Sequence, residues 1–475
     1  MSEQPVIHWF RRDLRMRDNM SLYHACEGDR PVIALFIIDT DLLNAERIGA
    51  PRLRFLLDAL NSLNARLQEY GTCLLVRHGQ PETIIPQLVN EVNASALYFN
   101  RDYSPYANRR DDAVADALDI PVHVYDDAIL MPPGSILKQD GDPYTVYTYF
   151  WKKWQVADKP EMMVRHFRSE WFYDISTLQN DGVPTLNTLG FDDTIGIVEA
   201  SEDQALALLD AFIETDIKHY SERRNWLPIA PYDDTRPSGT SYLSPFLRLG
   251  LLSPRQAYWA ARGAYQKTQS TQYRESITTW VSELAWREFY THILHFFPHV
   301  LKRDFVDTYQ ALAWRDDAED LQAWQDGMTG YPVVDAAMRQ LKAIGWMPNR
   351  ARMIVASFLT KDLLIHWYHG DIHFMKHLID GDPAANNGGW QWAAGTGTDA
   401  QPYFRIFNPI SQSKKYASPE YIRHWIPELE NVPDKTIHEP WTIDNPPDDY
   451  PAPIVDHAMA RERTLNAFKA ARGEG

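Results

Sequence analysis

The sequence predicts an N-terminal α/β domain with a doubly wound parallel sheet, followed by an all-helical C-terminal domain. Short apolar runs alternate with helical patterns over the first 130 residues, whereas after about residue 203 the strand-like runs disappear and helical periodicity dominates. At 475 residues the chain is also too long for one ordinary hydrophobic core. We therefore divide it into an α/β domain at 1–130, a connector at 131–202 and a helical domain at 203–475.

The α/β domain contains five runs that predict strands and three stretches that predict helices. The apolar runs lie at 6–10, 32–38, 73–76, 96–99 and 122–125. The helical patterns between them lie at 51–70, 81–92 and 108–118. Ligands bind beyond the carboxyl ends of the strands in such sheets. We therefore expect a site at the residues that follow three of these strands, namely Arg11, Arg12, Asp39, Arg101 and Asp102.

The connector loses this rhythm and is rich in Pro, Gly and Asp, so we expect a long segment with little helix. Irregular segments of this length are uncommon unless they serve a function. In the helical domain, periodic apolar residues predict helices at 202–218, 253–265, 272–296, 333–344 and 350–368.

The composition is typical of a water-soluble globular protein, with 44% hydrophobic and 23% charged residues. The two cysteines, Cys26 and Cys73, are too few for a disulfide framework or a cysteine-rich metal site. The sequence has neither an apolar run of roughly 18 residues nor the pattern of a signal peptide. We expect a cytoplasmic protein without a metal or a membrane segment.

Net charge and aromatic content point in different directions. The formal net charge is −17, which repels DNA on average. Aromatic residues make up 12% of the chain and include 16 Trp. A single Trp is more often part of a core than of a site. Only clusters that combine Trp with polar residues are therefore candidates for binding a cofactor or a base.

One such cluster lies in the predicted helix at 272–296. Its members recur at spacings of three and four and share one face; they are Trp280, Glu283, Trp286, Arg287 and Tyr290. This face is too polar for a plain core and too aromatic for a plain surface. It forms either a structural Glu283–Arg287 pair capped by Trp, or a cavity wall that stacks on a planar ligand and offers it one carboxylate.

The segment GWMPNRARM places Asn349, Arg350 and Arg352 at the start of a predicted helix. Arg339 and Lys342 lie nearby, and no acid occurs between Ala336 and Met353. A local positive strip binds phosphates even on an acidic protein, because screening makes near charges matter most. The alternative is an ordinary solvated face.

The segment DGDPAANNGGWQW (380–392) combines two Asp, two Asn and three Gly with two Trp. Asp, Asn and Gly together predict an unusual backbone that allows close approach. An Asn side chain there could donate a hydrogen bond to a ring nitrogen, and Asp380 could pair with Arg352. The hydroxyl-rich turn GTSYLS (239–244) offers amides to a phosphate. These patterns are also compatible with ordinary loops and caps, so spacing alone predicts a polar, aromatic-lined pocket in the helical domain.

Taken together, these segments resemble the photolyase/cryptochrome family, and more narrowly the class I cyclobutane pyrimidine dimer photolyases. The resemblance spans nearly the whole chain, through HWFRRDLRMRDN, PYTVYTYFWKKW, GTSYLSP, ELAWREFY, GYPVVDAAMRQL, NRARMIVASFLTKDLLIHW, DGDPAANNGGWQW and RIFNPISQSKKY. It implies a light-driven repair enzyme, a carbon–carbon lyase that acts on ultraviolet-damaged DNA as a monomer.

The resemblance implies that FAD, folded into a U shape, lies in the helical domain. The implied contacts are Tyr220, Thr240, Ser241, Tyr242, Leu243, Ser244, Trp280, Arg287, Arg352, Asp380, Gly381 and Asp382. Asn386 would face the flavin N5 and favour the reduced, anionic flavin, because a neutral amide adds no negative charge. Asn at this position is photolyase-like, whereas plant cryptochromes have Asp there and animal cryptochromes have Cys.

The resemblance also implies that a pyrimidine dimer is flipped out of the duplex into the pocket. Glu283 would hydrogen-bond the dimer and stabilise its radical anion. The other implied DNA contacts are Trp286 and Trp392, which stack, Asn349 and Met353, which touch the dimer, and Arg224 and Arg350, which hold phosphates. A chain of three tryptophans would reduce oxidised flavin, namely Trp390, Trp367 and Trp314.

Two departures from the family pattern stand out. Pro348 replaces the usual His before Asn349, which argues against six-four photolyase activity. Extra residues at 226–236 would reshape the loop near the DNA or the adenine, so the resemblance supports the assignment of Arg224 less than that of Glu283.

Many relatives bind a second, light-harvesting chromophore on the α/β domain. Residues of this chain that look like the deazaflavin-binding members are Phe36, Asp39, Arg52, Asp102 and Tyr106. A deazaflavin is therefore favoured over methenyltetrahydrofolate, with a flavin nucleotide or an empty site as alternatives. The rival functions are a cryptochrome light sensor and a single-strand-specific enzyme of the DASH group. The complete set of implied dimer contacts opposes the sensor, and we expect no long signalling tail.

Overall fold

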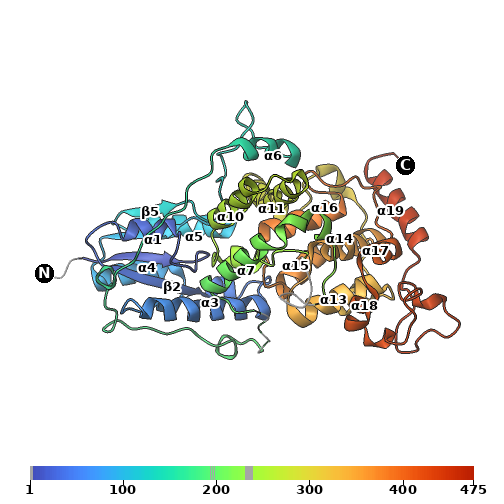
Figure 1. The fold of residues 1–475 in the computed structure, drawn as a ribbon, viewed down its shortest axis with the longest axis horizontal. Coiled ribbons are helices and arrows are strands. Elements are labelled where there is room, and N and C mark those ends of the chain that lie inside the picture. The colour runs from blue at the N-terminus through green and yellow to red at the C-terminus, as the bar shows by residue number, and fades with distance from the viewer. Residues whose placement is uncertain (1–3, 193, 195, 197, 230–238, 475) are drawn as a thin grey trace.

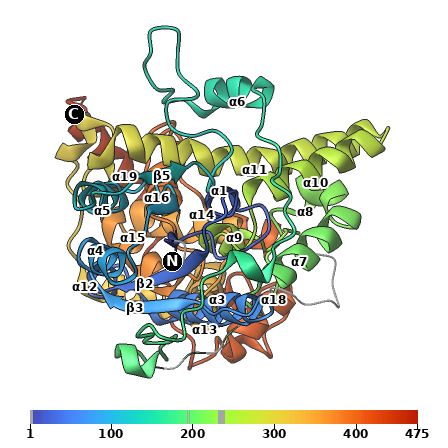
Figure 2. The ribbon, with the colours of Figure 1, turned by 90° about the vertical axis from the view of Figure 1, so that its left-hand side faces the viewer.

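The computed structural model describes residues 4–192, 194, 196, 198–229 and 239–474. Figure 1 shows an elongated molecule in which a sheet with flanking helices forms one end and packed helices form the rest. In Figure 2 the long helix α11 (Thr271–Phe296) runs across the width of the molecule. The predicted fold class, an α/β domain followed by a helical domain, is confirmed.

The sheet has five parallel strands in the order β3-β2-β1-β4-β5. The strands are β1 (Val6–Phe10), β2 (Val32–Asp39), β3 (Leu75–Gly79), β4 (Ala96–Asn100) and β5 (Val122–Tyr125). All five predicted strands are present, although the third begins at Leu75 rather than at 73. The strand order reverses between β1 and β4, so the switch point lies where Arg11, Arg12 and Asp102 follow these two strands.

Both faces of the sheet are covered. The helices of the domain are α1 (Met20–Ala25), α2 (Thr40–Leu43), α3 (Ala50–Gln68), α4 (Pro81–Val92) and α5 (Pro105–Asp116). Side chains of β1 alternate between two cores: Ile7 and Trp9 pack beneath α4 and α5, and Phe10 packs with α3. The core around Phe10 continues into the helical domain as far as Leu284 of α11. The helical domain therefore closes one face of the sheet.

The connector wraps back over the α/β domain. Its regular elements are α6 (Tyr147–Val156), η1 (Ser169–Trp171) and η2 (Asn187–Leu189). Figure 1 shows α6 and the hairpin before it projecting from the body of the molecule. After α6 the chain returns to the sheet, where the Tyr173 amide donates to the Val32 carbonyl at 3.0 Å.

The helical domain is built from short and medium helices around α11. Its other elements are α7 (Glu202–Glu214), η3 (Ile217–His219), α8 (Tyr220–Arg223), α9 (Ser244–Leu249), α10 (Pro254–Lys267), η4 (Pro298–Leu301), η5 (Asp307–Ala311), α12 (Ala318–Asp326), α13 (Pro332–Ile344), α14 (Asn349–Ser357), η6 (Phe358–Asp362), α15 (Trp367–His377), α16 (Pro383–Ala394), α17 (Pro409–Tyr416), α18 (Pro419–Trp425), η7 (Pro427–Leu429), η8 (Pro440–Thr442) and α19 (His457–Ala471). Four of the five helices predicted here are present with shifts of a few residues at their ends.

The fifth, at 350–368, is wrong as a single helix. α14 passes into the π-helical turn η6 and then stops. Leu364 has a φ of +56°, a left-handed conformation that a helix interior does not contain. α15 begins anew at Trp367, with His366 accepting from the Tyr368 amide as its cap. Helical periodicity continues across the break because both helices bury residues in the same core.

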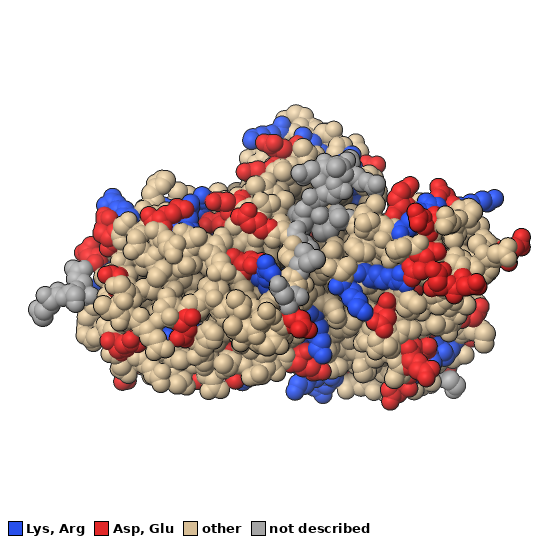
Figure 3. Space-filling view, turned by 90° about the horizontal axis from the view of Figure 1, so that it is seen from below, with Lys and Arg blue, Asp and Glu red and all other residues tan. Residues whose placement is uncertain are grey.

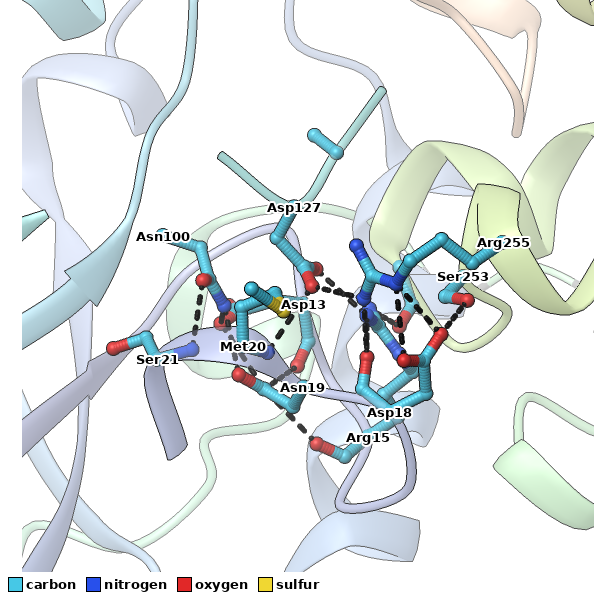
Figure 4. Close-up of polar contacts among 12 residues, drawn as sticks. Asp13, Arg15, Asp18, Asn19, Met20, Ser21, Asn100, Asp127, Ser253 and Arg255 are labelled. Atoms are coloured by element: carbon cyan, nitrogen blue, oxygen red, sulfur yellow. Dashed lines mark hydrogen bonds and ion pairs between the residues drawn. The ribbon is translucent and has the colours of Figure 1, made fainter. Parts of the chain in front are cut away.

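A buried network of charges joins the two domains (Figure 4). Asp127 accepts from Arg15 at 2.7 Å and from Arg255 at 2.6 Å, and Arg255 also donates to Asp18 at 3.0 Å. Burial alone would raise the pKa of Asp127, but the two arginines hold it at about 2. Much of the motif HWFRRDLRMRDN therefore serves the domain interface, a role that spacing did not reveal.

Charge on the surface is mixed in sign. Figure 3 shows acidic and basic side chains interspersed over the face seen from below, with much uncharged surface between them. In the part of the chain that the structure describes, none of the helices has both the length and the apolar character needed to cross a bilayer.

Candidate functional site

A cavity of about 490 Å³ opens in the helical domain between α8, α9, α11, α14, α15 and α16. Most of the residues implied to bind FAD or DNA line it. They are Tyr220, Arg224, Thr240, Ser241, Tyr242, Leu243, Ser244, Trp280, Glu283, Trp286, Arg287, Asn349, Arg352, Met353, Asp380, Gly381, Asp382, Asn386, Trp390 and Trp392. The residues that line this cavity are spread over 173 positions of the sequence, from Tyr220 to Trp392. The fold brings them together from six helices and the loops next to them.

α11 supplies one wall of the cavity. Trp280, Glu283, Trp286, Arg287 and Tyr290 all line it, as their spacing predicts. The alternative Glu283–Arg287 pair does not form, because Arg287 donates to the carbonyls of residues 128 and 247 at 2.7 and 3.2 Å. The five residues therefore form part of a cavity wall, while their stacking on a planar ligand stays a prediction.

Glu283 pairs instead with Arg224, at 2.8 Å between Oε1 and Nη1. Burial raises the pKa of Glu283, and the Arg224 guanidinium lowers it only in part. Burial thus favours the protonated form of Glu283 and the pair with Arg224 favours the ionised form, so the carboxyl would take up a proton more readily if Arg224 moved away. Its partner Arg224 lies 59 positions earlier in the sequence, so no local pattern indicated the pair.

Trp286 is fixed by the connector. Its ring stacks on Tyr147 of α6 with centroids 3.5 Å apart and an interplanar angle of 9°. The Tyr147 hydroxyl in turn donates to the Ser282 carbonyl of α11 at 2.7 Å. The connector thus holds a cavity residue from behind, which gives part of this long segment a role at the site.

Asp382 anchors the segment 380–392. It caps α16 by accepting from the amides of Ala384 and Ala385, and its Oδ2 lies 2.9 Å from Arg12 of the α/β domain. Burial alone would raise the pKa of Asp382, but the nearby guanidiniums, above all that of Arg12, hold it at about 2. Asp382 is therefore a permanently ionised group in the cavity wall.

The glycines of this segment allow close approach, although most of the segment is a regular helix. A Cβ on Gly388 would lie 2.1 Å from the Tyr290 ring, and one on Gly381 would lie 2.3 Å from Arg52. The prediction of close approach is therefore confirmed. The prediction of an unusual backbone is wrong, since 383–394 is the helix α16, started by Pro383 at a position that proline favours.

Asn386 is held by Asp371, a residue that the sequence did not indicate. Its Nδ2 donates to Asp371 Oδ1 at 2.6 Å and to the Asp371 carbonyl at 3.0 Å. Because these bonds use both amide hydrogens, the oxygen remains for the cavity. In this arrangement the amide oxygen of Asn386 suits acceptance from a ring N–H better than its nitrogen suits donation to a ring nitrogen, and the role of Asn386 beside a flavin stays a prediction.

The predicted pair between Asp380 and Arg352 is confirmed, with Oδ2 and Nη2 2.8 Å apart. Arg352 also donates to the Met347 carbonyl at 2.8 Å, which fixes its guanidinium. Elsewhere in the cavity wall, Trp280 Nε1 donates to Ser241 Oγ at 3.2 Å. The wall thus presents polar groups whose positions are set by the protein itself.

Two buried polar atoms of the cavity wall have no hydrogen-bond partner among the described residues. They are Trp390 Nε1 and Arg248 Nη1. Unsatisfied buried donors are rare in folded proteins and mark places where a further molecule binds. A large, planar, polar ligand that bears anionic groups fits this cavity, and FAD has these properties.

Comparison with known proteins agrees with this fit. A family model for the FAD binding domain of DNA photolyase matches residues 280–470, and one for DNA photolyase matches residues 6–164. Curated deoxyribodipyrimidine photo-lyases from Halobacterium salinarum and Synechococcus sp. are each 41% identical to this chain. The alignments cover 98% and 99% of this chain and 99% and 98% of the relatives. The chain belongs to the DNA photolyase family.

Solved structures of this family share the whole fold. A class III photolyase from Agrobacterium tumefaciens superposes with a TM-score of 0.89 at 36% identity, covering 100% of this chain and 98% of the other. A Synechocystis cryptochrome gives a TM-score of 0.86 at 30% identity, covering 98% of this chain and 99% of the other. An archaeal photolyase from Sulfolobus tokodaii, which has two FAD molecules, gives 0.84 at 30% identity, covering 98% and 100%.

The two arginines implied to hold DNA phosphates are both engaged with other side chains. Arg224 pairs with Glu283, and Arg350 donates to Asn225 Oδ1 at 2.8 Å and stacks on Tyr416 at 4.5 Å. Arg350 does not appear among the residues of the cavity wall. α14 begins at Asn349 with Pro348 as its cap residue, as the sequence predicts. Of the extra residues 226–236, those at 230–236 lie outside the described residues.

The three tryptophans of the implied electron chain differ in exposure. Trp390 and Trp367 are buried, and Trp314 is partly exposed. Trp390 packs directly on Gly370 of α15, the helix that Trp367 begins, and the His366 ring lies 5.1 Å from both Trp367 and Trp314. The buried Trp324, 5.9 Å from Trp390, was not singled out from the sequence.

The residues proposed for a second chromophore do not form one open set. Tyr106 donates to Asp39 at 2.7 Å, and Phe36 is buried in the core. Arg52 donates to the carbonyls of residues 375 and 378 in the helical domain, and Asp102 pairs with Arg12 at 3.0 Å. Arg52 and Asp102 are therefore part of the domain interface.

In the described part of the chain, no cluster of three or more His, Cys, Asp or Glu could hold a metal ion.

Proposed function

We propose that this protein is a light-driven DNA repair enzyme that splits cyclobutane pyrimidine dimers, with FAD bound in the cavity of the helical domain. The observation that supports this most directly is that one cavity is lined both by the polar segment 380–386 and by Glu283 with the aromatic residues Trp286 and Trp392; we call this second part the mouth of the cavity. The relatives named deoxyribodipyrimidine photo-lyase match nearly the full length of the chain. When bound and reduced, FAD would supply an electron to the dimer after absorbing light.

The chain would hold FAD from both domains. Asp380 with Arg352, and Asp382 with Arg12, present fixed carboxylates to the flavin and ribityl parts. The turn at 239–244 would address the diphosphate through its amides and hydroxyls. Asn386 would accept a hydrogen bond from the reduced flavin at N5, so the fully reduced, anionic form would be favoured without a further negative charge.

The mouth of the cavity would receive a dimer flipped out of the duplex. Trp286 and Trp392 would stack on it, which contributes roughly 1–3 kcal/mol per base. Asn349 would hydrogen-bond it and Met353 would pack against it. Glu283 would exchange its contact with Arg224 for the dimer, offer a hydrogen bond to a pyrimidine carbonyl and stabilise the radical anion. Arg224, once released, would be free to reach a flanking phosphate.

Three finer proposals follow from the family pattern. Trp390, Trp367 and Trp314 would pass electrons inward from the surface and keep the bound flavin reduced. A deazaflavin would serve as the second chromophore at the strand ends near Asp39 and Tyr106. An absorption spectrum of the protein purified from its native host would identify this chromophore. The protein would act as a monomer on duplex DNA, since nothing in the cavity depends on a second copy.

The test is illumination of the reduced protein with an oligonucleotide that contains a thymine dimer, while the thymine absorbance is followed. Light-dependent recovery of that absorbance is expected, and its absence would contradict the proposal. The likeness to a Synechocystis cryptochrome favours a light sensor as the second candidate. A sensor would bind FAD and respond to light in the same assay without restoring thymine.

A further inference from the structure

Arg47 reaches from the α/β domain into the helical domain. It lies in the loop between α2 and α3, and its Nη1 is 2.7 Å from Asp371 Oδ2 of α15. The loop is pressed onto the end of that helix, because a Cβ on Gly49 would lie 1.7 Å from the Lys376 carbonyl oxygen. The position of Arg47 is therefore set by close backbone packing and not by a free side chain.

Asp371 connects Arg47 to the flavin site. Its side chain is fully buried, with one oxygen toward Arg47 and the other accepting from Asn386. The Asp371 carbonyl accepts the second Asn386 amide hydrogen. The carboxylate thus fixes which end of the Asn386 amide faces the cavity.

A buried carboxylate stays ionised only where a positive charge compensates it. Burial raises the pKa of Asp371 to about 6, and the Arg47 guanidinium opposes that rise. The polar group that faces Asp371 from α16, Asn386, is neutral. If Arg47 were absent, the carboxyl would take up a proton more readily. A protonated carboxyl can itself donate, so the amide of Asn386 could turn round.

We propose that Arg47 is a positioning residue of the flavin site, which orients the amide of Asn386 by holding Asp371 ionised. This inference rests on the proposed function in one respect, namely that FAD lies in the cavity beside Asn386. The charges of Arg47 and Asp371 cancel. An ionised carboxylate therefore orients Asn386 without adding net negative charge beside the flavin, which suits an anionic flavin.

The first test is the rate at which air reoxidises the light-reduced flavin in the full-length holoenzyme. Arg47→Gln should speed reoxidation by roughly five- to tenfold, the range expected when one hydrogen bond is lost. Arg47→Lys, which keeps the charge, should stay within about twofold of the parent protein. If both variants behave alike, the charge of Arg47 is not the cause and the inference is wrong.

A double-mutant cycle separates positioning from domain docking. Asn at 371 is neutral and needs no cation, so Arg47→Gln should add nothing further in an Asp371→Asn background. An equal effect in both backgrounds would mean that Arg47 only docks the two domains. FAD content and far-ultraviolet circular dichroism are recorded for each variant, and Arg47→Lys keeps the test decisive if Arg47→Gln does not fold.

Infrared spectroscopy of the holoenzyme gives a readout that does not depend on repair. The band of a protonated, buried carboxyl should appear at higher pH in Arg47→Gln than in the parent protein, and the Asp371→Asn variant should lack that band. A parent protein that binds FAD but splits no dimers contradicts the proposed function alone. A parent protein that splits dimers, with no change of reoxidation or band in Arg47→Gln, contradicts only this inference.

Discussion

The cavity of the helical domain and the strand ends of the α/β domain were both expected to bind a chromophore, and they differ in how their polar groups are used. The cavity leaves Trp390 Nε1 and Arg248 Nη1 without a partner among the described residues. At the strand ends, Asp39 is engaged by Tyr106, and Asp102 is engaged by Arg12. Unsatisfied groups around an open space indicate a ligand, whereas polar groups that satisfy one another indicate structure.

One residue at the strand ends departs from this rule. Nε and Nη2 of the buried Arg11 lack a hydrogen-bond partner in the described part of the chain, while its Nη1 meets Asp111 at 2.6 Å. The guanidinium lies against the rings of Trp9 and Phe99, at 4.8 and 4.5 Å. If a second chromophore binds there, Arg11 is a better candidate to meet it than Arg52, which is engaged by backbone carbonyls of the helical domain.

The largest effect is expected at Asp382. Asp382→Ala should lower the FAD content of the purified protein roughly tenfold or more, because it removes one of the two carboxylates that pair with Arg12 and also removes the cap of α16. The ratio of flavin to protein absorbance measures this. Asp39→Ala, the same change at the strand ends, should leave FAD content unchanged. Equal FAD loss in both variants would break the comparison between the two regions.

The next effect is expected at Glu283. Glu283→Ala should lower the yield of dimer splitting about tenfold, because a hydrogen bond to the reacting group is lost, while FAD content falls little. The repair assay and the flavin absorbance are measured on the same samples. Glu283→Gln, which retains a hydrogen-bond donor, should lose less yield than Glu283→Ala. Loss of flavin in place of yield would make the carboxylate a structural group.

Binding of dimer-containing DNA should weaken with salt in spite of the net charge of −17. Affinity is expected to fall by about tenfold or more between about 50 and 200 mM salt. Arg350→Gln should reduce the slope of log K against log salt by about 1, provided that Arg350 leaves Asn225 to hold a phosphate. Fluorescence anisotropy of a labelled duplex measures the slope. A flat response in the parent protein would mean that no basic groove exists.

The smallest effect is expected at Tyr106. Tyr106→Phe removes one hydrogen bond to Asp39, so the free energy of unfolding should fall by about 1 kcal/mol. FAD content and repair under light absorbed by the flavin should stay unchanged. Denaturant unfolding and the repair assay measure the two. A loss of repair only at wavelengths that a second chromophore absorbs would sharpen the comparison by showing a ligand at the strand ends.

The sequence predicted the elements well because their signals are local. Short apolar runs made the strands visible, and the spacing on α11 narrowed its polar, aromatic face to two alternatives, a structural Glu283–Arg287 pair or a cavity wall. The break at Leu364 was missed because both helices that flank it keep their apolar residues in one core. Periodicity reports which face is buried and does not report a single residue with positive φ.

The pairings inside the site were hidden for a different reason. Glu283 meets Arg224, and Asn386 meets Asp371, only after separate helices have packed against one another. Spacing indicated a polar, aromatic pocket, and the family resemblance assigned individual residues to it. Neither could show that the Asn386 amide already donates its hydrogens within the protein, since those bonds depend on its contact with Asp371 of α15.

The stack of Tyr147 on Trp286 has a thermodynamic consequence for binding. A free indole on the surface would lose rotamer freedom when a base stacks on it, and that loss would weaken association. Here the ring is immobilised in advance by a tyrosine whose own hydroxyl is tied to the same helix. A base that arrives on the cavity side would meet a ring that is already ordered. The loss of side-chain entropy that orders this ring therefore occurs when the connector folds and not when DNA binds.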